Sequence, residues 1–330
     1  MTAISIIVPV YNVYNYLSRC LESLVHQTFT GDYEIICVND GSTDNSGSIL
    51  ESFASQYDNI KIITQENKGL SEARNEGMKF AAGKYTLFVD SDDFIAENAL
   101  ELLYNYAEEH NSDVVIFDMH KITGYLEIKQ TTKWQNIIDK YGENCFNIHT
   151  AEPFVYRFVP VAAWNKLYLT SLIKDLKFIK GITCEDVPYW TLVYSKAQRV
   201  SYFPKALYFY IIDRQGAITL TNTKRVFDVI KAFADTEKTL KECGCYEKLK
   251  YIHWAHFASN LSFNLRTIDR SLRKEFVDKI KSLEIDIDYD EFLKQNFYPF
   301  ENEDMKIIKI VQQYDFDMLE KIFYNTHFWI

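Results

Sequence analysis

Hydrophobic and polar positions follow two periodicities in the first third of the chain. Short apolar runs lie in the segments SIIVPVYN, YEIICVND, NIKIITQE, YTLFVD and SDVVIFDM, and such runs are typical of buried parallel strands. Between them, apolar residues recur at helical spacing, as at Leu17, Leu21 and Leu24. Strands and helices therefore alternate over about the first 118 residues. This alternation predicts an α/β fold whose parallel sheet has right-handed crossovers.

Local signals predict where several of these helices begin and end. Asp44 or Ser46 could cap the helix that contains SILESFASQY, because short polar side chains accept hydrogen bonds from the first N–H groups of a helix. Gly83 would end the helix in LSEARNEGMKFAAG, since glycine is common just after the last helical residue. Asp92 or Asp93 could cap the helix in ENALELLYNYAEEH.

The pattern changes along the rest of the chain. Residues 119–220 are mixed and rich in aromatic side chains, and the chain becomes mainly helical from about residue 223. The segments RVFDVIKAFADTEKTLKECG and RKEFVDKIKSLEI have apolar residues at helical spacing. We therefore expect one domain at residues 1–220, with halves at 1–118 and 119–220, and a helical region at residues 221–330.

Composition and charge narrow the class of protein. The 330 residues are 47% hydrophobic, which supports a sizeable core, and the formal net charge of −10 disfavours nucleic acid as the main partner. The six cysteines form no CxxC pair, as is typical of reduced thiols in a cytosolic protein. The N-terminus does not resemble a signal peptide, and no window reaches the roughly 18–20 apolar residues of a spanning helix. We expect a soluble, cytoplasmic protein.

Three carboxylates follow an apolar run in the stretch TLFVDSDDF. Alternation along an extended segment would point Asp90 and Asp92 to the same side, with Ser91 between them. Two carboxylates on one side form a partial shell for Mg²⁺ or Mn²⁺, which often leaves its other positions to phosphate oxygens and water. The predicted partner is a metal with a diphosphate, and the alternative is a helix cap.

Polar clusters follow three predicted strands, in PVYN, NDGS and DSDD. Ligands of open parallel sheets bind at the carboxyl ends of the strands. Asp40 could accept a hydrogen bond from a nucleobase or ribose, and the alternative is a turn with a helix cap. Arg74, one turn into a helix, could reach a phosphate or pair with strand-end carboxylates. Taken alone, a surface ion pair is the simpler interpretation of Arg74.

The segments that carry these clusters occur in a recognisable order. SIIVPVYN, VNDGSTDNS, ENKGLSEARNEGM, AAGKYTLFVDSDDF, AWNKLYLTSLI, CEDVPYW and YFYIIDRQGAIT together resemble the bacterial glycosyltransferases of family 2, over residues 4 to about 220. The resemblance implies a GT-A (Rossmann-like) fold that transfers a sugar from a nucleotide diphosphate donor with inversion at the anomeric carbon. It also implies a nucleotide-binding half at residues 1–118 and an acceptor half at 119–220.

The resemblance implies a nucleotide site made of residues that follow the early strands. These residues are Pro9, Tyr11, Asn12, Asp40, Asn67, Arg74 and Asp90. The first three would line the nucleoside pocket, and Asp40 would bind the base, which is often uracil. Asn67 and Arg74 would contact the nucleotide, and Asp90 would face the ribose.

The resemblance also implies the metal ligand and the catalytic base. Asp92 would hold Mn²⁺ or Mg²⁺ as the ligand of the DXD motif, with Ser91 against the donor. Asp186 would be the base, and Arg214 would approach the diphosphate. The segment YFYIIDRQGAIT lacks the histidine that serves some members as a further metal ligand.

The chemistry of GITCEDVPYW agrees with this assignment. Direct displacement by an acceptor hydroxyl needs one base on the face opposite the leaving group, and a metal neutralises a diphosphate leaving group. Adjacent side chains point in different directions, so we assign Asp186 as the base and Glu185 as an acceptor contact or a supporting group. The alternative is a carboxylate pair at a helix start. Trp164 could stack on a sugar but is more typical of a core residue, and Lys166 could pair with Asp186 or the donor.

The last 110 residues match no motif, and their basic residues gather in one segment. The segment contains only three acidic residues beside six basic ones, which are Arg266, Arg270, Arg273, Lys274, Lys279 and Lys281. This segment could be a solvated helix face, dock on anionic lipid headgroups, or pair subunits in a homo-oligomer. Residues 221–330 as a whole could also have a role at the acceptor. His253 and His256, three apart on a predicted helix, are typical of packing residues.

We therefore expect an inverting, metal-dependent glycosyltransferase that uses a nucleotide sugar, with UDP as the expected carrier. Its acceptor would be a glycan or lipid-linked hydroxyl in bacterial surface polysaccharide synthesis. Two other classes stay open at this point. A nucleotidyltransferase also uses strand-end aspartates and a metal, but it usually needs a glycine-rich phosphate loop that PVYNVYN does not provide. A non-catalytic glycan-binding protein would have a degenerate site, whereas Asp90, Asp92 and Asp186 are all present.

Overall fold

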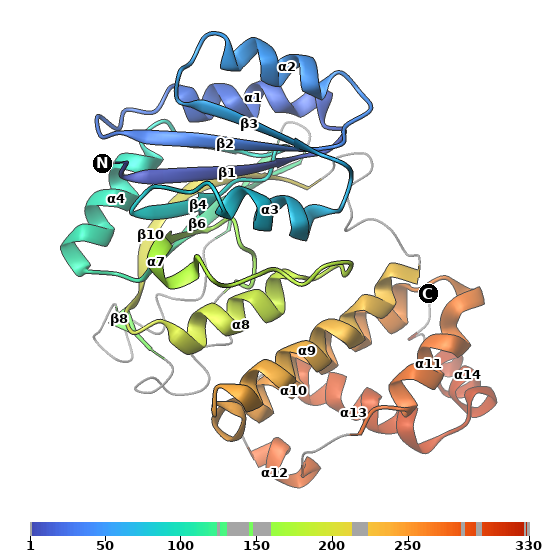
Figure 1. Cartoon of the computed structure of the whole chain (residues 1–330). Coiled ribbons are helices and arrows are strands. Elements are labelled where there is room, and N and C mark those ends of the chain that lie inside the picture. Colours follow the sequence, from blue (N-terminus) through green and yellow to red (C-terminus); the bar gives the residue numbers. More distant parts are fainter. Residues whose placement is uncertain are drawn as a thin grey trace. The chain divides into compact units, whose positions relative to one another are not determined.

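The structure is a computed structural model of the chain (Figure 1). It describes residues 2–123, 126–130, 145–147, 160–212, 224–284, 288–294, 299–326 and 328. Contacts divide the chain into two compact units, of which the first contains residues 1–181 and 189–217. The second contains residues 218–330 together with the short segment Ile182–Pro188.

The first unit is built on a mixed sheet. Its described strands are β1 (Ile4–Val10), β2 (Tyr33–Asp40), β3 (Ile60–Gln65), β4 (Tyr85–Phe88), β5 (Phe94–Ile95), β6 (Val114–Thr123), β7 (Leu126–Gln130), β8 (Cys145–Phe146), β9 (Lys166–Leu169) and β10 (Val200–Ile211). They lie in the order β3-β2-β1-β4-β9-β6-β10-β5, while β7 pairs with β6 and β8 with β10. β1 to β4 pair in parallel, which confirms the predicted start of the sheet.

The second half of this sheet departs from a simple parallel arrangement. β9 is antiparallel to both β4 and β6 and lies between them. β6 therefore runs in the same direction as β4 without pairing with it. β9 begins about 50 residues after the start of β6 and inserts between β4 and β6. Hydrophobic periodicity does not report such long-range pairing.

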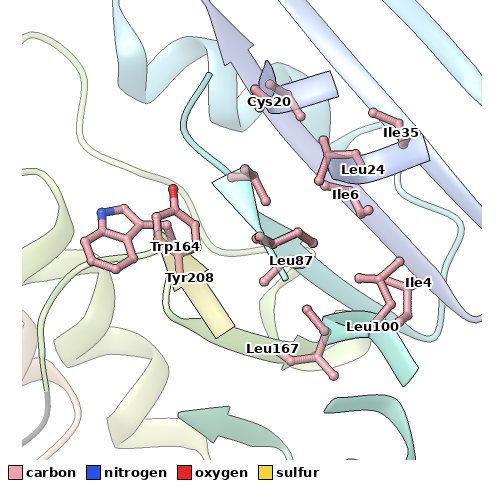
Figure 2. Packing of buried hydrophobic residues seen from close by; sticks show 14 of the residues in the cluster. Ile4, Ile6, Cys20, Leu24, Ile35, Leu87, Leu100, Trp164, Leu167 and Tyr208 are labelled. Carbon is pink, nitrogen blue, oxygen red and sulfur yellow. The ribbon is translucent and has the colours of Figure 1, made fainter. Parts of the chain in front are cut away.

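Helices cover both faces of the first part of the sheet (Figure 1). These helices are α1 (Tyr14–Val25), α2 (Ser46–Ala54), α3 (Leu70–Met78) and α4 (Ala99–His110), followed by α7 (Thr170–Ile173) and α8 (Asp186–Lys196). Leu24 of α1 lies beside Ile6 in Figure 2, and both belong with Leu87 to the main core. On the opposite face, a Cβ at Gly77 of α3 would lie 2.6 Å from a methyl group of Ile7. Gly77 therefore lets α3 pack directly against β1.

Two predicted helix ends are corrected by this packing. α3 ends at Met78, five residues before Gly83. Gly83 is needed for a different reason, because a Cβ there would lie 2.4 Å from the backbone nitrogen of Ser5. At the start of α2, the N-cap position is Asn45, whose side chain forms no capping hydrogen bond, and neither Asp44 nor Ser46 occupies it. The Asp44 carboxylate, one residue earlier, accepts a hydrogen bond from the Ser46 N–H at 2.9 Å.

The second unit is helical, as the sequence predicts for the C-terminal region. It contains η2 (Lys224–Phe227), α9 (Asp228–Glu242), α10 (Tyr246–Thr267), η3 (Arg270–Leu272), α11 (Arg273–Lys281), α12 (Tyr289–Lys294), α13 (Pro299–Gln313) and α14 (Phe316–Asn325). Leu261 of α10 and Phe276 of α11 belong to its own hydrophobic core. Within the described ranges, no helix is both long and apolar enough to cross a membrane.

His253 of α10 is a packing residue, as expected. Its ring stacks on Phe233 at 4.0 Å between ring centroids, and burial lowers the pKa of His253 to about 3. The imidazole is therefore neutral at physiological pH.

Candidate functional site

The loop after β1 is fastened to the loop after β2 by one asparagine. Asn12 has a positive φ of 50°, a backbone conformation in which asparagine is enriched. Its Oδ1 accepts hydrogen bonds from the N–H groups of Thr43 at 2.8 Å and Asp44 at 3.3 Å. Tyr11 next to it is 46% exposed. Asn12 therefore holds the loop after β1 against the loop after β2, while the exposed ring of Tyr11 is available to a ligand.

Pro9 is buried inside β1 and breaks no pairing of the sheet. The β1–β4 register ends at Ile7 and Phe88, so β4 does not pair with β1 at Pro9. A proline, which lacks an N–H group, is tolerated where a strand has no partner on that side.

Asp40 holds the loop that carries Asn67. Its carboxylate is 2% exposed and accepts hydrogen bonds from the backbone N–H groups of Lys68 at 2.9 Å and Gly69 at 2.8 Å. The Gln65 side chain is a third donor, at 2.6 Å. In this structure the carboxylate therefore fixes the β3–α3 loop, and Asn67 lies exposed on it. The contact of Asp40 with a nucleobase stays a prediction.

The acidic stretch after β4 is a turn, not the extended segment that we expected. β4 ends at Phe88, and the N–H of Asp93 donates to the carbonyl of Asp90 at 3.0 Å. Strand alternation therefore cannot be used to orient Asp90 and Asp92. Ser91 is buried within this turn, and Asp92 is partly exposed.

Arg74 provides a positive charge beside the turn. Its guanidinium lies 2.8 Å from the carboxylate of Asp90 and is 1% exposed, so the interpretation as a surface ion pair was wrong. The guanidinium also lies over the ring of Phe178, 5.1 Å from its centroid. The alternative pairing with a strand-end carboxylate is confirmed. The contact of Arg74 with a nucleotide stays a prediction.

Asp93 is directed into the protein and does not cap α4. Its carboxylate accepts hydrogen bonds from the Tyr208 hydroxyl and the Ile211 N–H, both at 2.8 Å. Burial raises its pKa well above the ordinary value, and the negative charges of Asp92 and Asp90 add to this effect. Nearby like charges repel one another, which favours the protonated form of Asp93. Helix α4 begins after Asn98 without a side-chain cap.

The donor set of the turn fits a hard divalent cation. Within the described ranges, no group of three or more metal-ligating side chains is present. Asp90 is paired with Arg74, and Asp93 with Tyr208 and the Ile211 N–H. Asp92 is partly exposed, as is Asp90. Mg²⁺ and similar ions bind through one or two carboxylates when substrate phosphates supply the other ligands.

Glu185 and Asp186 lie at the start of α8, whose first helical residue is Asp186. The preceding Cys184 has a φ of 66°, which is rare for a residue other than glycine. Thr183 donates from its N–H at 2.8 Å and from its hydroxyl at 3.2 Å to one carboxylate oxygen of Asp228. Asp228 of α9 thus anchors the segment that carries the predicted base. Arg214 lies outside the described residues.

The neighbouring predictions have mixed outcomes. Trp164 is a core residue, since it is buried and stacks on Tyr208 at 4.4 Å. Lys166 is buried and donates to the carbonyls of Pro160 and Ala162. Tyr208 and Phe178 contact the site, but we did not identify them from the sequence. The aromatic run YFYI around Tyr208 was visible, whereas its pairing with Asp93, 115 residues away, was not.

Comparisons with known proteins indicate the family of the chain. Residues 5–156 match the family model for glycosyl transferase family 2. Glycosyltransferase GlyA of Streptococcus pneumoniae serotype 4 is 37% identical over 67% of this chain and 32% of its own length. The poly(ribitol-phosphate) beta-glucosyltransferase of Bacillus spizizenii is 36% identical over 64% of this chain and 33% of its own length. The chain thus spans about a third of the length of these two relatives.

A third relative is covered along most of its length. Glycosyltransferase GlyG of Streptococcus pneumoniae serotype 4 is 32% identical over 73% of this chain and 80% of its own length. Among solved structures, Staphylococcus aureus TarS 1–349 in complex with UDP-GlcNAc has a TM-score of 0.60 at 22% identity, over 84% of this chain and 87% of that chain. That likeness shows the GT-A type of fold. By its relatives, its family model and its fold, the chain belongs to glycosyl transferase family 2.

Proposed function

We propose that the protein transfers a sugar from a UDP-linked donor to a hydroxyl of a glycan or lipid-linked acceptor during synthesis of a bacterial cell-surface polymer, with inversion. The relatives support the reaction class, because they are named glycosyltransferases and one is a poly(ribitol-phosphate) beta-glucosyltransferase. The similar structure of TarS contains UDP-GlcNAc, which supports UDP as the carrier.

One observation carries the proposal, which is the position of the acidic turn (Asp90–Asp93). This turn follows β4, is paired with Arg74, and lies beside the ends of β1 and β2. β1 pairs with both β2 and β4, in parallel. The loops that contain Asn12, Asp40 and Asp92 therefore leave neighbouring strands at one edge of the sheet, where ligands of such sheets bind. A nucleotide diphosphate matches this edge, since it brings anionic oxygens to a metal and hydrogen-bonding groups to the loops.

The proposed roles divide the site into donor, metal and acceptor parts. Pro9, Tyr11, Asn12, Asp40, Asn67, Arg74, Asp90, Ser91 and Arg214 form the donor part. Asp92 would hold Mn²⁺ or Mg²⁺, and this ion would neutralise charge on the diphosphate leaving group. Asp186 accepts the proton of the attacking hydroxyl, and Glu185 contacts the acceptor or supports Asp186.

Residues 221–330 have two proposed partners, an anionic membrane surface and a second copy of the chain. Lys274 and Lys279 are exposed on α11, and each basic residue near an anionic surface contributes about 1 kcal/mol to binding. Membrane binding predicts co-sedimentation with anionic liposomes that is lost in high salt. Light scattering of the full chain tests self-association. We propose a cytoplasmic location at the inner membrane face.

A donor panel with two variants tests the reaction. Wild-type protein with Mn²⁺ should show a thermal shift with one UDP-sugar. Asp92→Ala should lose this metal-dependent shift and keep its fold. Asp186→Asn should keep the shift and lower turnover by about 10²–10⁴-fold, the range for loss of a general base. Donor binding that is unchanged in Asp92→Ala and by EDTA would contradict the metal role, and near-normal turnover of Asp186→Asn would move the base elsewhere.

The same panel separates the other two classes. A nucleotidyltransferase would join a nucleoside triphosphate to a sugar phosphate and release pyrophosphate. Pyrophosphate release would contradict the proposed glycosyl transfer. A glycan-binding protein would bind sugars but leave every UDP-sugar intact in the presence of Mn²⁺ and acceptor glycans. Release of UDP from one donor is the result that supports glycosyl transfer.

A further inference from the structure

The hydroxyl of Tyr208 holds the acidic turn at two points. It accepts a hydrogen bond from the Asp90 N–H at 3.1 Å and donates one to the Asp93 carboxylate at 2.8 Å. Tyr208 and Asp93 are both 0% exposed. Because the interior strengthens hydrogen bonds and makes unpaired polar groups costly, these two contacts constrain the turn more than surface contacts would.

The two contacts lie on either side of Ser91 and Asp92. The N–H of Asp90 precedes this pair in the chain, and the side chain of Asp93 follows it. The Asp93 N–H closes the turn on the Asp90 carbonyl at 3.0 Å. The second oxygen of Asp93 accepts from the N–H of Ile211, the last residue of β10. The backbone that carries Asp92 is thus fixed at both ends to β10.

Tyr208 is itself held in one orientation. Its ring stacks on Trp164 with 4.4 Å between centroids and 19° between planes, and Figure 2 shows the two rings side by side. Tyr210 stacks on the same indole at 5.2 Å. A phenol ring packed in this way has lost its rotamer freedom, so its hydroxyl oxygen has a defined position.

We propose that Tyr208 is a positioning residue that sets the place of the Asp92 carboxylate relative to a bound divalent cation and its diphosphate. This inference rests on the proposed function, in which Asp92 is the protein ligand. Mg²⁺ demands near-octahedral geometry, and a misplacement of about 1 Å can cost up to about 10²-fold in rate. A turn without the Tyr208 hydroxyl would present Asp92 in a wider range of positions.

Tyr208→Phe tests the proposal, and Tyr202→Phe is its matched control. Tyr202 lies on the same strand, is also buried and donates to a buried carboxylate, that of Asp118. Each variant loses one phenol hydroxyl that donates to a buried carboxylate, so both should lower the urea midpoint of unfolding to a similar extent. Only Tyr208→Phe should weaken Mn²⁺ binding in the presence of UDP, by about tenfold, the cost of about 1.4 kcal/mol.

Metal selectivity is the second measurement. Selectivity between Mg²⁺ and Ca²⁺ depends on the size and rigidity of the site, so Tyr208→Phe should bring the two affinities closer together, and Tyr202→Phe should not. Calorimetric titration of the full chain with each metal and UDP measures this ratio without turnover. Equal metal affinity and selectivity in the two variants would overturn the proposal. Wild-type protein that binds no metal with UDP would instead refute the proposed function.

Discussion

At the scale of the residue, the site is governed by how each carboxylate of the acidic turn is compensated. Asp90 has the guanidinium of Arg74 at 2.8 Å. Asp93 has two hydrogen-bond donors, and burial raises its pKa well above the ordinary value. Asp92 lies between these two residues and is partly exposed. Three neighbouring aspartates therefore have three different environments, which is why they can have three different roles.

The ion pair between Arg74 and Asp90, whose arginine is buried, should contribute more to stability than the exposed pair between Lys84 and Glu108. Arg74→Met keeps the bulk of the side chain but leaves the carboxylate of Asp90 without its cation. Because breaking a buried pair costs more than breaking an exposed one, we expect a loss of about 3 kcal/mol in the free energy of unfolding. Lys84 and Glu108 form a comparable pair with side chains 46% and 37% exposed.

Urea denaturation of Arg74→Met and Lys84→Met measures both losses. Lys84→Met is the control and should lose no more than about 1 kcal/mol, as is usual for exposed pairs. Equal losses in the two variants would show that the Arg74–Asp90 pair adds nothing beyond a surface contact.

At the scale of the element, two segments far from the acidic turn in sequence shape the site. β10 provides Tyr208 and Ile211, and α9 provides Asp228, which is bonded to Thr183. The second contact gives the helical unit a part in holding the segment that carries Glu185 and Asp186. Because Asp186 is the proposed base, the bond between Asp228 and Thr183 gives residues 221–330 an indirect part in the proposed catalysis.

Asp228→Ala tests this role. The variant removes the acceptor shared by the N–H and hydroxyl of Thr183, so the segment Ile182–Pro188 should exchange its amide hydrogens faster. If Asp186 is the base, turnover should fall by about tenfold with donor affinity unchanged, as expected when only transition-state interactions are lost.

Glu242→Ala on the same helix is the control, because the Glu242 side chain is 68% exposed and its ion pair with Lys238 is long, at 3.8 Å. Hydrogen exchange and steady-state kinetics of both variants decide the question. Protection of Thr183 that is the same in Asp228→Ala and wild type would rule out the anchor.

At the scale of the whole molecule, each of the two units has a main hydrophobic core of its own among the described residues. Leu87 belongs to the core of the first unit and Leu261 to that of the second, and both are 0% exposed. We therefore expect calorimetry to resolve two unfolding transitions, because each unit has a core of its own. UDP with Mn²⁺ should raise the midpoint of one of them, since a ligand stabilises the unit that binds it.

Leu87→Ala and Leu261→Ala assign the transitions. Each variant creates a cavity that costs about 2–5 kcal/mol, and each should lower the midpoint of its own unit. The transition that Leu87→Ala lowers should be the one that UDP and Mn²⁺ raise. A single transition that both variants lower alike would contradict this description.

The sequence by itself determined the features that depend on local spacing. Apolar runs and helical periodicity predicted the parallel strands β1 to β4 and the helices between them, because each such element buries one continuous set of side chains. The motifs from SIIVPVYN to YFYIIDRQGAIT identified the family. The clusters around Asn12, Asp40 and Asp90 were predicted to lie close together because the carboxyl ends of parallel strands meet at one edge of a sheet.

Only the tertiary structure decided the features that depend on contacts between distant residues. β9 enters antiparallel between β4 and β6, Arg74 is buried against Asp90, and Tyr208 bonds to Asp93 across 115 residues. Gly83 is needed because the backbone of β1 passes close to it, and not because a helix ends there. Periodicity reports which face of an element is buried, whereas the partner on that face is set by packing of the whole chain. The role of a polar residue such as Asp93 follows from that partner.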